Sequence, residues 1–241
     1  LYSYSVRYMS EECLELPGRT IQPVFCDMTP KQWEVYREVE AQAFTEVQDS
    51  VVKAENKLTT LAKVFQITSG FVNDVNGKPV LFEPKAPKIE ALREMLASTD
   101  KSIIVFAWHS FILEMLHEEY KADSALYYGS MSASDKTQSE NLFKAGKKRI
   151  LFGQEMAAGR GLNLQIAPYS IFLERNHSLD NYTQALKRNH RDGQKSHCFA
   201  YLLMVNNTVD TDIQDVLDAK ASDSDVALAT IQRNMARRLG R

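Results

Sequence analysis

Cysteine is scarce in this chain of 241 residues, which has three: Cys13, Cys26 and Cys198. An odd number without the short paired spacing of metal ligands argues against a disulfide framework and a zinc site, and predicts reduced thiols inside a cell. Long apolar runs are missing too, since none approaches the roughly 18 residues that span a bilayer. Because no signal peptide opens the chain either, we expect an intracellular, cytoplasmic protein with no membrane partner and no metal-binding residues of its own.

A large excess of charge of one sign is also missing. The 29 basic and 31 acidic side chains give a net charge of −2, so contact with nucleic acid would have to come from a local basic stripe. The pattern Gly-x-x-x-x-Gly-Lys-Ser/Thr does not occur, so the chain has no P-loop of its own. The first residue is Leu1 and not Met, from which we expect a fragment of a longer protein.

What is present divides at about residue 87. Before it, the apolar residues have the spacing of two long helices. Thr29 suits a helix N-cap and Pro30 the first helical position, while Gly70 suits a helix end. The expected elements are a strand at 21–26, a helix from 29 to about 54, a helix at 56–69, and a loop or hairpin at 71–88.

After residue 87, short apolar runs alternate with amphipathic helices. Residues 102–107 form a continuous run that is typical of a strand buried on both faces. The alternation predicts βαβ units and a mostly parallel sheet covered on both faces, with binding loops beyond the carboxyl ends of its strands. Helices are expected at 88–96, 111–120, 132–144 and 179–187, and strands at 102–107, 124–128, 149–153, 170–173 and 198–205.

Three loops that follow strands carry candidate phosphate contacts. Trp108-His109-Ser110 and Gly129-Ser130 each lead from a strand into a helix, where free backbone N–H groups favour an anion. In the segment 157–164, Gly159 and Gly161 would let backbone N–H groups approach an anion closely. Each loop also has a plainer interpretation, as core packing of the two aromatic rings or as an ordinary turn and helix cap.

The segment from Gln184 to Gln194 is rich in basic and amide side chains. Arg188 and Arg191 lie three residues apart, so on a helix or its end two guanidinium groups point the same way and can converge on one polyanion. The alternative is a solvated basic helix end that complements the helix dipole.

In this order, the elements and motifs resemble the second RecA-like lobe of superfamily-two helicases, and specifically the Swi/Snf-type DNA translocases related to chromatin remodellers. The similarity runs from the N-terminal arm to about Leu217, and the His-Arg-Asp-Gly-Gln sequence at 190–194 is its most specific part. The matching blocks are Val6-Arg7 and Leu16-Pro17 of the arm, Ile103–Phe106, Gly129-Ser130 with Phe143, Ala157–Leu164 and Gln184–Gln194.

This resemblance implies an α/β fold, in which a RecA-like, mostly parallel sheet lies between helices and is preceded by a helical protrusion. It divides the chain into a linker arm with a strand from the first lobe (1–27), the helical protrusion (28–86), the helicase C-terminal lobe (87–220) and a basic helical tail (221–241). The pattern of the protrusion is equally that of simple core helices, and the tail equally suits a solvated helix end or a contact with DNA or the first lobe.

The resemblance also implies an ATP-dependent motor that has DNA, single- or double-stranded, and a first RecA-like lobe as partners. That first lobe would hold most of the ATP and Mg, so the fragment alone should be inactive. Arg188 and Arg191 would be catalytic arginine fingers, which stabilise charge on the transferring phosphoryl group. The nucleotide-binding residues would be these two with Gln184, Gly161 and Asn163, and the nucleic-acid-binding residues Ser110, Trp108, Gly129, Ser130, Gly159 and Arg160.

Departures from the family pattern indicate a divergent branch, bacterial or viral. They are Lys136, Gln154-Glu155 in place of small hydroxyl residues, Ala158, Arg160, the segment 176–179, and Lys187. Two alternatives remain open: a strand-separating helicase lobe of the same superfamily, and a non-catalytic nucleic-acid-binding module that kept the RecA-like fold. The intact arginine pair favours the motor.

Overall fold

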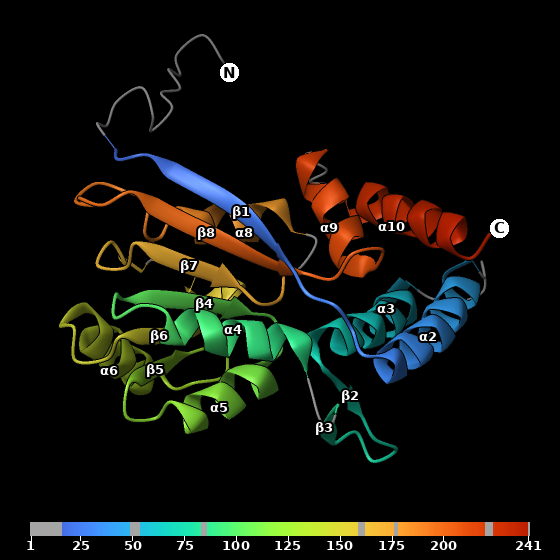
Figure 1. Cartoon of the computed structure of the whole chain (residues 1–241), viewed down its shortest axis with the longest axis horizontal. Helices are drawn as coiled ribbons and strands as arrows, with labels where there is room; N and C mark the ends of the chain where they lie inside the picture. The colour runs from blue at the N-terminus through green and yellow to red at the C-terminus, as the bar shows by residue number, and fades with distance from the viewer. Residues whose placement is uncertain are drawn as a thin grey trace, which may run out of the picture.

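The computed structural model describes residues 16–48, 54–82, 86–158, 162–175, 178–219 and 224–240. At its centre is a six-stranded sheet in the order β1-β8-β7-β4-β6-β5, in which every pair is parallel (Figure 1). The expected α/β fold with a parallel sheet is therefore confirmed. The strands are β1 (Arg19–Phe25), β4 (Ile103–Ala107), β5 (Ser124–Tyr127), β6 (Ile150–Gln154), β7 (Tyr169–Phe172) and β8 (Cys198–Met204).

Helices cover both faces of this sheet. Successive residues of a strand point to opposite faces, and in β7 the side chain of Ile171 faces Met95 of α4 (Pro87–Ala97). The ring of the next residue, Phe172, meets Tyr182 of α8 (Leu179–Leu186) at 5.2 Å. Central strand β4 is buried along its whole length, as its apolar sequence predicts. Helices α5 (Ser110–Glu119) and α6 (Ala133–Lys144) and the short α7 (Glu155–Ala158) complete the layers.

Strand β1 is an edge strand of this sheet. It pairs with β8 from Arg19 opposite Cys198 to Phe25 opposite Met204. Residues 19–25 therefore belong to the sheet of this lobe. Pro23 is compatible with this edge position, because its missing N–H removes no hydrogen bond of the sheet. The assignment of residues 1–27 to a linker arm and strand from the first lobe stays a prediction.

The helical protrusion consists of α2 (Pro30–Gln48) and α3 (Ala54–Ser69), which pack side by side. A small antiparallel hairpin, β2 (Phe71–Asn73) with β3 (Pro79–Leu81), follows them. Two C-terminal helices, α9 (Val209–Asp218) and α10 (Ser224–Arg238), lie against this pair (Figure 1). Helix α9 was not predicted, because its amphipathic stretch is short. No helix of the described residues is both long and apolar enough to cross a membrane.

The basic tail is docked on the protrusion and is not merely a solvated helix end. Arg238 of α10 donates to Glu40 of α2 at 2.6 Å and to both carboxylate oxygens of Asp212 of α9 at 2.7 Å. Both carboxylates are almost fully buried, and a buried charge without a partner is costly. The guanidinium of Arg238 compensates both charges. Arg237, by contrast, is exposed.

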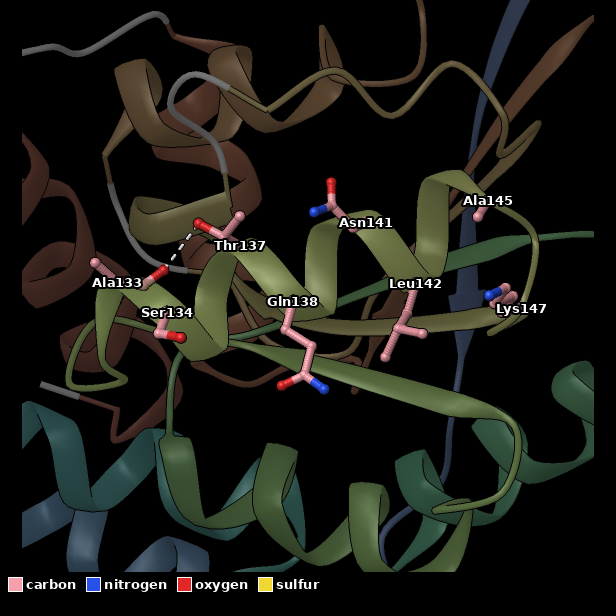
Figure 2. A pocket seen from close by; sticks show the side chains of 8 residues that line it. All are labelled: Ala133, Ser134, Thr137, Gln138, Asn141, Leu142, Ala145 and Lys147. Atoms are coloured by element: carbon pink, nitrogen blue, oxygen red, sulfur yellow. Dashed lines mark hydrogen bonds between the residues drawn. The ribbon is translucent and has the colours of Figure 1, made fainter.

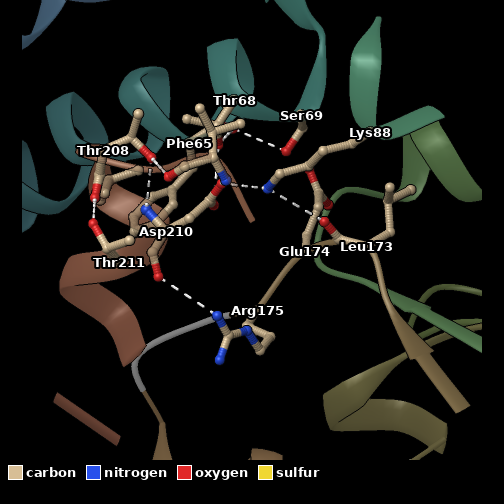
Figure 3. A network of polar contacts seen from close by, with 12 residues as sticks. Phe65, Thr68, Ser69, Lys88, Leu173, Glu174, Arg175, Thr208, Asp210 and Thr211 are labelled. Carbon is tan, nitrogen blue, oxygen red and sulfur yellow. Dashed lines mark hydrogen bonds and ion pairs between the residues drawn. The ribbon is translucent and has the colours of Figure 1, made fainter. Parts of the chain in front are cut away.

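A buried ion pair joins the protrusion to the sheet (Figure 3). The ammonium of Lys88, at the start of α4, lies 2.6 Å from Asp210 of α9, and the lysine side chain is 1% exposed. The carboxylate of Asp210 also accepts from the hydroxyl of Thr68 in α3 and from the backbone N–H of Val205 after β8. Four elements therefore meet at one buried carboxylate, which fixes the protrusion over the carboxyl ends of β7 and β8.

Candidate nucleotide and nucleic-acid site

Residues 187–197, which we call the arginine loop, lie at the amino-terminal edge of the sheet. His190 hydrogen-bonds through Nε2 to the carbonyl of Pro17, two residues before β1, at 2.7 Å. Gln194 donates to the carbonyl of Gln165, a few residues before β7, at 3.0 Å. We had expected binding loops beyond the carboxyl ends of the strands. The arginine loop follows a helix that runs back across the sheet, so it emerges at the opposite edge.

The two predicted arginine fingers lie near each other in this loop. The guanidinium of Arg188 donates to the carbonyl of Gln184 at 3.1 Å and to the carbonyl of Leu162 at 3.2 Å. Burial, and then the positive charge of Arg191, lower the pKa of Arg188. Neither guanidinium has a carboxylate partner among the described residues. Two neighbouring cations without a counter-ion form a site that favours a polyanion.

Gln194 holds the arginine loop in shape. Its Nε2 group donates to the carbonyls of Gln165, Ala167 and Asn189, while its Oε1 accepts from the N–H groups of the next two residues. Gly193 adopts a φ of +90°, and a Cβ there would lie 3.0 Å from Nε2 of Gln165. The Gly-Gln ending of the motif is therefore structural: the glycine allows the turn and the glutamine fastens it.

Asn163 has the most unusual polar atom near these arginines. Its Oδ1 is buried and has no hydrogen-bond partner in the described part of the chain. The neighbouring Leu164 N–H donates to the carbonyl of Arg188, which brings the segment 162–164 against the arginine loop. An unmatched acceptor is costly unless something donates to it, so this site suits a ligand with a donor group. The predicted residues Gly159, Arg160 and Gly161 lie outside the described residues, and the side chain of Gln184 is half-buried.

The other predicted cluster lies at the carboxyl ends of the strands. Trp108, His109 and Ser110 follow β4, as expected, and Ser110 is the first residue of α5. The N–H groups of Trp108 and His109 both donate to Oε2 of Glu174 at 2.8 Å. We had expected these N–H groups to be free for a phosphate, and this is corrected: a carboxylate of the same chain already occupies them. The side chain of Ser110 has no such partner among the residues that the structure describes.

Aromatic packing explains the positions of the Trp108 and His109 rings. The ring of Trp108 meets Phe65 of α3 at 5.5 Å, and the ring of His109 meets Phe71 at 5.1 Å, both edge to face. On the side that faces the protrusion, both rings are therefore packing groups, as the plainer interpretation predicts. A contact of Trp108 with nucleic acid stays a prediction.

The Gly129-Ser130 turn follows β5 and is held from two sides. The N–H of Gly129 donates to Oε1 of Gln154 at 3.0 Å, and its carbonyl accepts from the ammonium of Lys136 at 2.7 Å. Ser130 is exposed. Lys136 occupies a position where the family pattern usually has arginine, and in this structure its ammonium stabilises the turn.

Glu174 and Gln154 are residues that sequence reasoning missed. Gln154 is the last residue of β6, and Glu174 lies two residues beyond the end of β7. Polar side chains at the carboxyl edge of a parallel sheet are expected to act there, and that position is the signal that could have identified them. Glu174 is 5% exposed and accepts from three donors, including Nδ1 of His109 at 2.9 Å. Gln154 had been noted only as a departure from the family pattern.

A shallow hollow lies apart from both clusters, on the outer side of α6 (Figure 2). Thr137 turns back to the carbonyl of Ala133, whereas Gln138 and Leu142 point to the other side of the helix. Its lining contains one charged side chain, Lys147, and none of the predicted site residues. Within the described ranges, no group of three or more His, Cys, Asp or Glu residues is placed to hold a metal ion.

The sequence and fold are similar to those of known helicase lobes. Residues 87–193 match the family model described as the helicase conserved C-terminal domain. The human DNA annealing helicase and endonuclease ZRANB3 is 31% identical over 134 residues, which are 54% of this chain and 12% of that protein. The chain spans between 12% and 45% of the length of the curated relatives it matches.

Two solved structures share the whole fold. The C-terminal part of the Fun30 ATPase domain superposes with a TM-score of 0.70 at 16% identity, covering 94% of this chain and 100% of that one. The Sulfolobus solfataricus SWI2/SNF2 ATPase core in complex with dsDNA superposes with a TM-score of 0.63 at 20% identity, covering 95% of this chain and 49% of that one. At these identities the likeness establishes the RecA-like fold of the lobe.

Proposed function

We propose that this chain is the second RecA-like lobe of a Swi/Snf-type superfamily-two helicase, and so one half of an ATP-dependent motor that moves along DNA. The match of residues 87–193 to the helicase conserved C-terminal domain and the fold shared with SWI2/SNF2 ATPase lobes support this. The observation that carries the proposal is the pair Arg188 and Arg191, two adjacent guanidinium groups without a described carboxylate partner. The complete motor would be this lobe joined to a first lobe that supplies the P-loop and most of the ATP and Mg binding.

In this proposal the arginine loop faces the nucleotide. The residues fit a triphosphate, because the neighbouring guanidinium groups of Arg188 and Arg191 offer several donors to phosphate oxygens. ATP, when bound, supplies the phosphoryl group that is transferred to water. Arg188 and Arg191 stabilise the charge that spreads over its oxygens, and they do so without reorganisation because Gln194 and His190 already hold the loop.

The carboxyl-edge loops would contact the DNA backbone. Ser110 and Ser130 offer hydroxyl groups after the ends of β4 and β5, on either side of β6, and Lys136 adds a positive charge beside the Gly129-Ser130 turn. Contacts to phosphates give affinity without reading the sequence, which a protein that travels along DNA requires. Support also comes from the SWI2/SNF2 core whose solved structure contains dsDNA.

The test replaces Arg191 in the complete motor. Arg191→Ala should lower DNA-stimulated ATP hydrolysis by about a thousandfold, and Arg191→Lys should be nearly as poor because the fork, and not only the charge, is needed. DNA affinity should stay close to that of the wild type. Lys187→Ala, which removes an exposed charge from the same loop, is the control and should keep its activity.

Hydrolysis at the wild-type rate in Arg191→Ala would refute the finger assignment. A wild-type motor that binds DNA but never hydrolyses ATP would instead favour a non-catalytic binding module.

A further inference from the structure

Gln154 connects the loops that follow β4 and β5, two strands that do not pair with each other. It is the last residue of β6, and β6 lies between β4 and β5. Its Nε2 donates to the carbonyl of Trp108 after β4 at 2.8 Å, and its Oε1 accepts from the N–H of Gly129 after β5 at 3.0 Å. Because the donor and the acceptor of one amide are both used, only one orientation of the side chain satisfies both loops.

Each of the two loops is also anchored on its far side. Glu174 binds the N–H groups of Trp108 and His109, and Lys136 binds the carbonyl of Gly129. A short rigid chain of contacts therefore runs from the end of β7, through the two loops, to α6. Gln154 is the link in its middle, and without it the two loops are anchored separately.

We propose that Gln154 is a positioning residue that sets the spacing between the Trp108–Ser110 and Gly129-Ser130 loops, and so between the two DNA phosphates that Ser110 and Ser130 contact. This rests on the proposed function, in which these loops bind the DNA backbone. Two contacts on a shared rigid support bind one strand cooperatively, because fixing the first loop also fixes the second.

The bridge is a property of this chain and not of the family pattern, which has a small hydroxyl residue at this position. A serine side chain carries one oxygen on its Cβ, so it cannot reach two loops on either side of the strand. In this protein the amide of Gln154 gives both loops one shared hydrogen-bonded support.

The first measurement needs no DNA. Gln154→Ser should speed amide hydrogen exchange at Gly129 by about fivefold or more, since one hydrogen bond of ordinary strength is lost. Gln138→Ser makes the same chemical change at an exposed position of α6 and should leave that exchange rate unchanged. An unaltered rate at Gly129 in Gln154→Ser would overturn the bridge. Thermal unfolding of both variants checks that the lobe remains folded.

The second measurement is a double-mutant cycle for binding a duplex DNA at low salt, followed by fluorescence anisotropy. With Gln154 present, Ser110→Ala and Ser130→Ala together should weaken binding less than the product of their separate effects, with a coupling of about threefold. In the Gln154→Ser background the coupling should vanish and the effects should multiply. A merely stabilising residue would leave this coupling unchanged.

The outcomes separate this inference from the function on which it rests. If the serine substitutions weaken binding but the coupling survives Gln154→Ser, the positioning role is overturned while the DNA-binding role of the loops stands. If neither serine substitution weakens binding, the loops do not hold DNA, and both proposals are overturned.

Discussion

Nδ1 of His109 lies 2.9 Å from Oε1 of Glu174, and the two form an ion pair at the carboxyl edge of the sheet. Burial by itself would lower the pKa of His109, but the charge and hydrogen bond of Glu174 outweigh it, and the pKa is raised. Burial would raise the pKa of Glu174, but the charge and hydrogen bonds of His109 outweigh it, and that pKa is lowered. Each partner keeps the other charged.

This pair predicts a pH-dependent stability. A histidine whose pKa rises on folding stabilises the protein below its unfolded pKa of 6.5, and this contribution is lost as the pH rises through its folded pKa. A glutamate whose pKa falls on folding contributes above 4.5, and its share is lost as the pH falls through its folded pKa. The pair should therefore stabilise the lobe most between about pH 4.5 and 6.5.

His109→Asn tests this dependence, because the amide can still donate to Glu174 but does not titrate. The difference in unfolding free energy between wild type and variant, from urea titrations, should shrink between pH 6 and pH 9. A difference that is constant over this range would mean that folding does not raise the pKa of His109. His117→Asn, at a histidine that bonds to the hydroxyl of Ser124 and whose pKa is lowered by burial, should show no such loss of stability toward high pH.

The docking of α10 depends on Arg238. Arg238→Met keeps the apolar stem but leaves the carboxylates of Glu40 and Asp212 buried and without their cation. We expect a loss of about 3 kcal/mol in unfolding free energy. Arg237→Met changes the exposed neighbour on the same helix and should have little effect. Equal effects of the two substitutions in urea titrations would contradict the buried triad.

His190 fastens the arginine loop to the arm. In the complete motor, His190→Ala should reduce DNA-stimulated ATP hydrolysis by about tenfold, because one net hydrogen bond that orients the loop is lost. His197→Ala is the matched control, since His197 also bonds to the arm, through the Thr20 hydroxyl at 2.8 Å, but lies outside the segment between the two arginines. It should retain most of the activity. If both variants are equally impaired, general attachment of the arm, and not the orientation of the loop, is what matters.

The chain alone should not hydrolyse ATP, because the residues that hold the triphosphate are proposed to lie in the first lobe. It should bind DNA weakly, and raising the salt concentration from 50 to 200 mM should weaken binding by about tenfold or more. Phosphate release assays and anisotropy titrations measure the two. Robust hydrolysis by this chain would contradict the two-lobe proposal.

The sequence predicted the parts of the fold that depend on local pattern. Strand β4 was expected from its continuous apolar run, and α2 from the cap at Thr29 and the proline at 30. Helix α9 was missed because its apolar face is only three turns long and carries several aspartates. Strand β1 was expected from its alternating pattern, but the sequence of an edge strand does not indicate which sheet it joins.

The arginine pair was predicted from the sequence alone, because the segment 184–194 resembles a specific family motif that contains both arginines. The tertiary structure alone decided where those groups lie and what holds them. Contacts such as Pro17 with His190, Trp108 with Gln154, and His109 with Glu174 join residues far apart in the chain. Only the parallel packing of the strands brings their amino ends together at one edge and their carboxyl ends together at the other, and no local pattern records which side chain will then meet which backbone group.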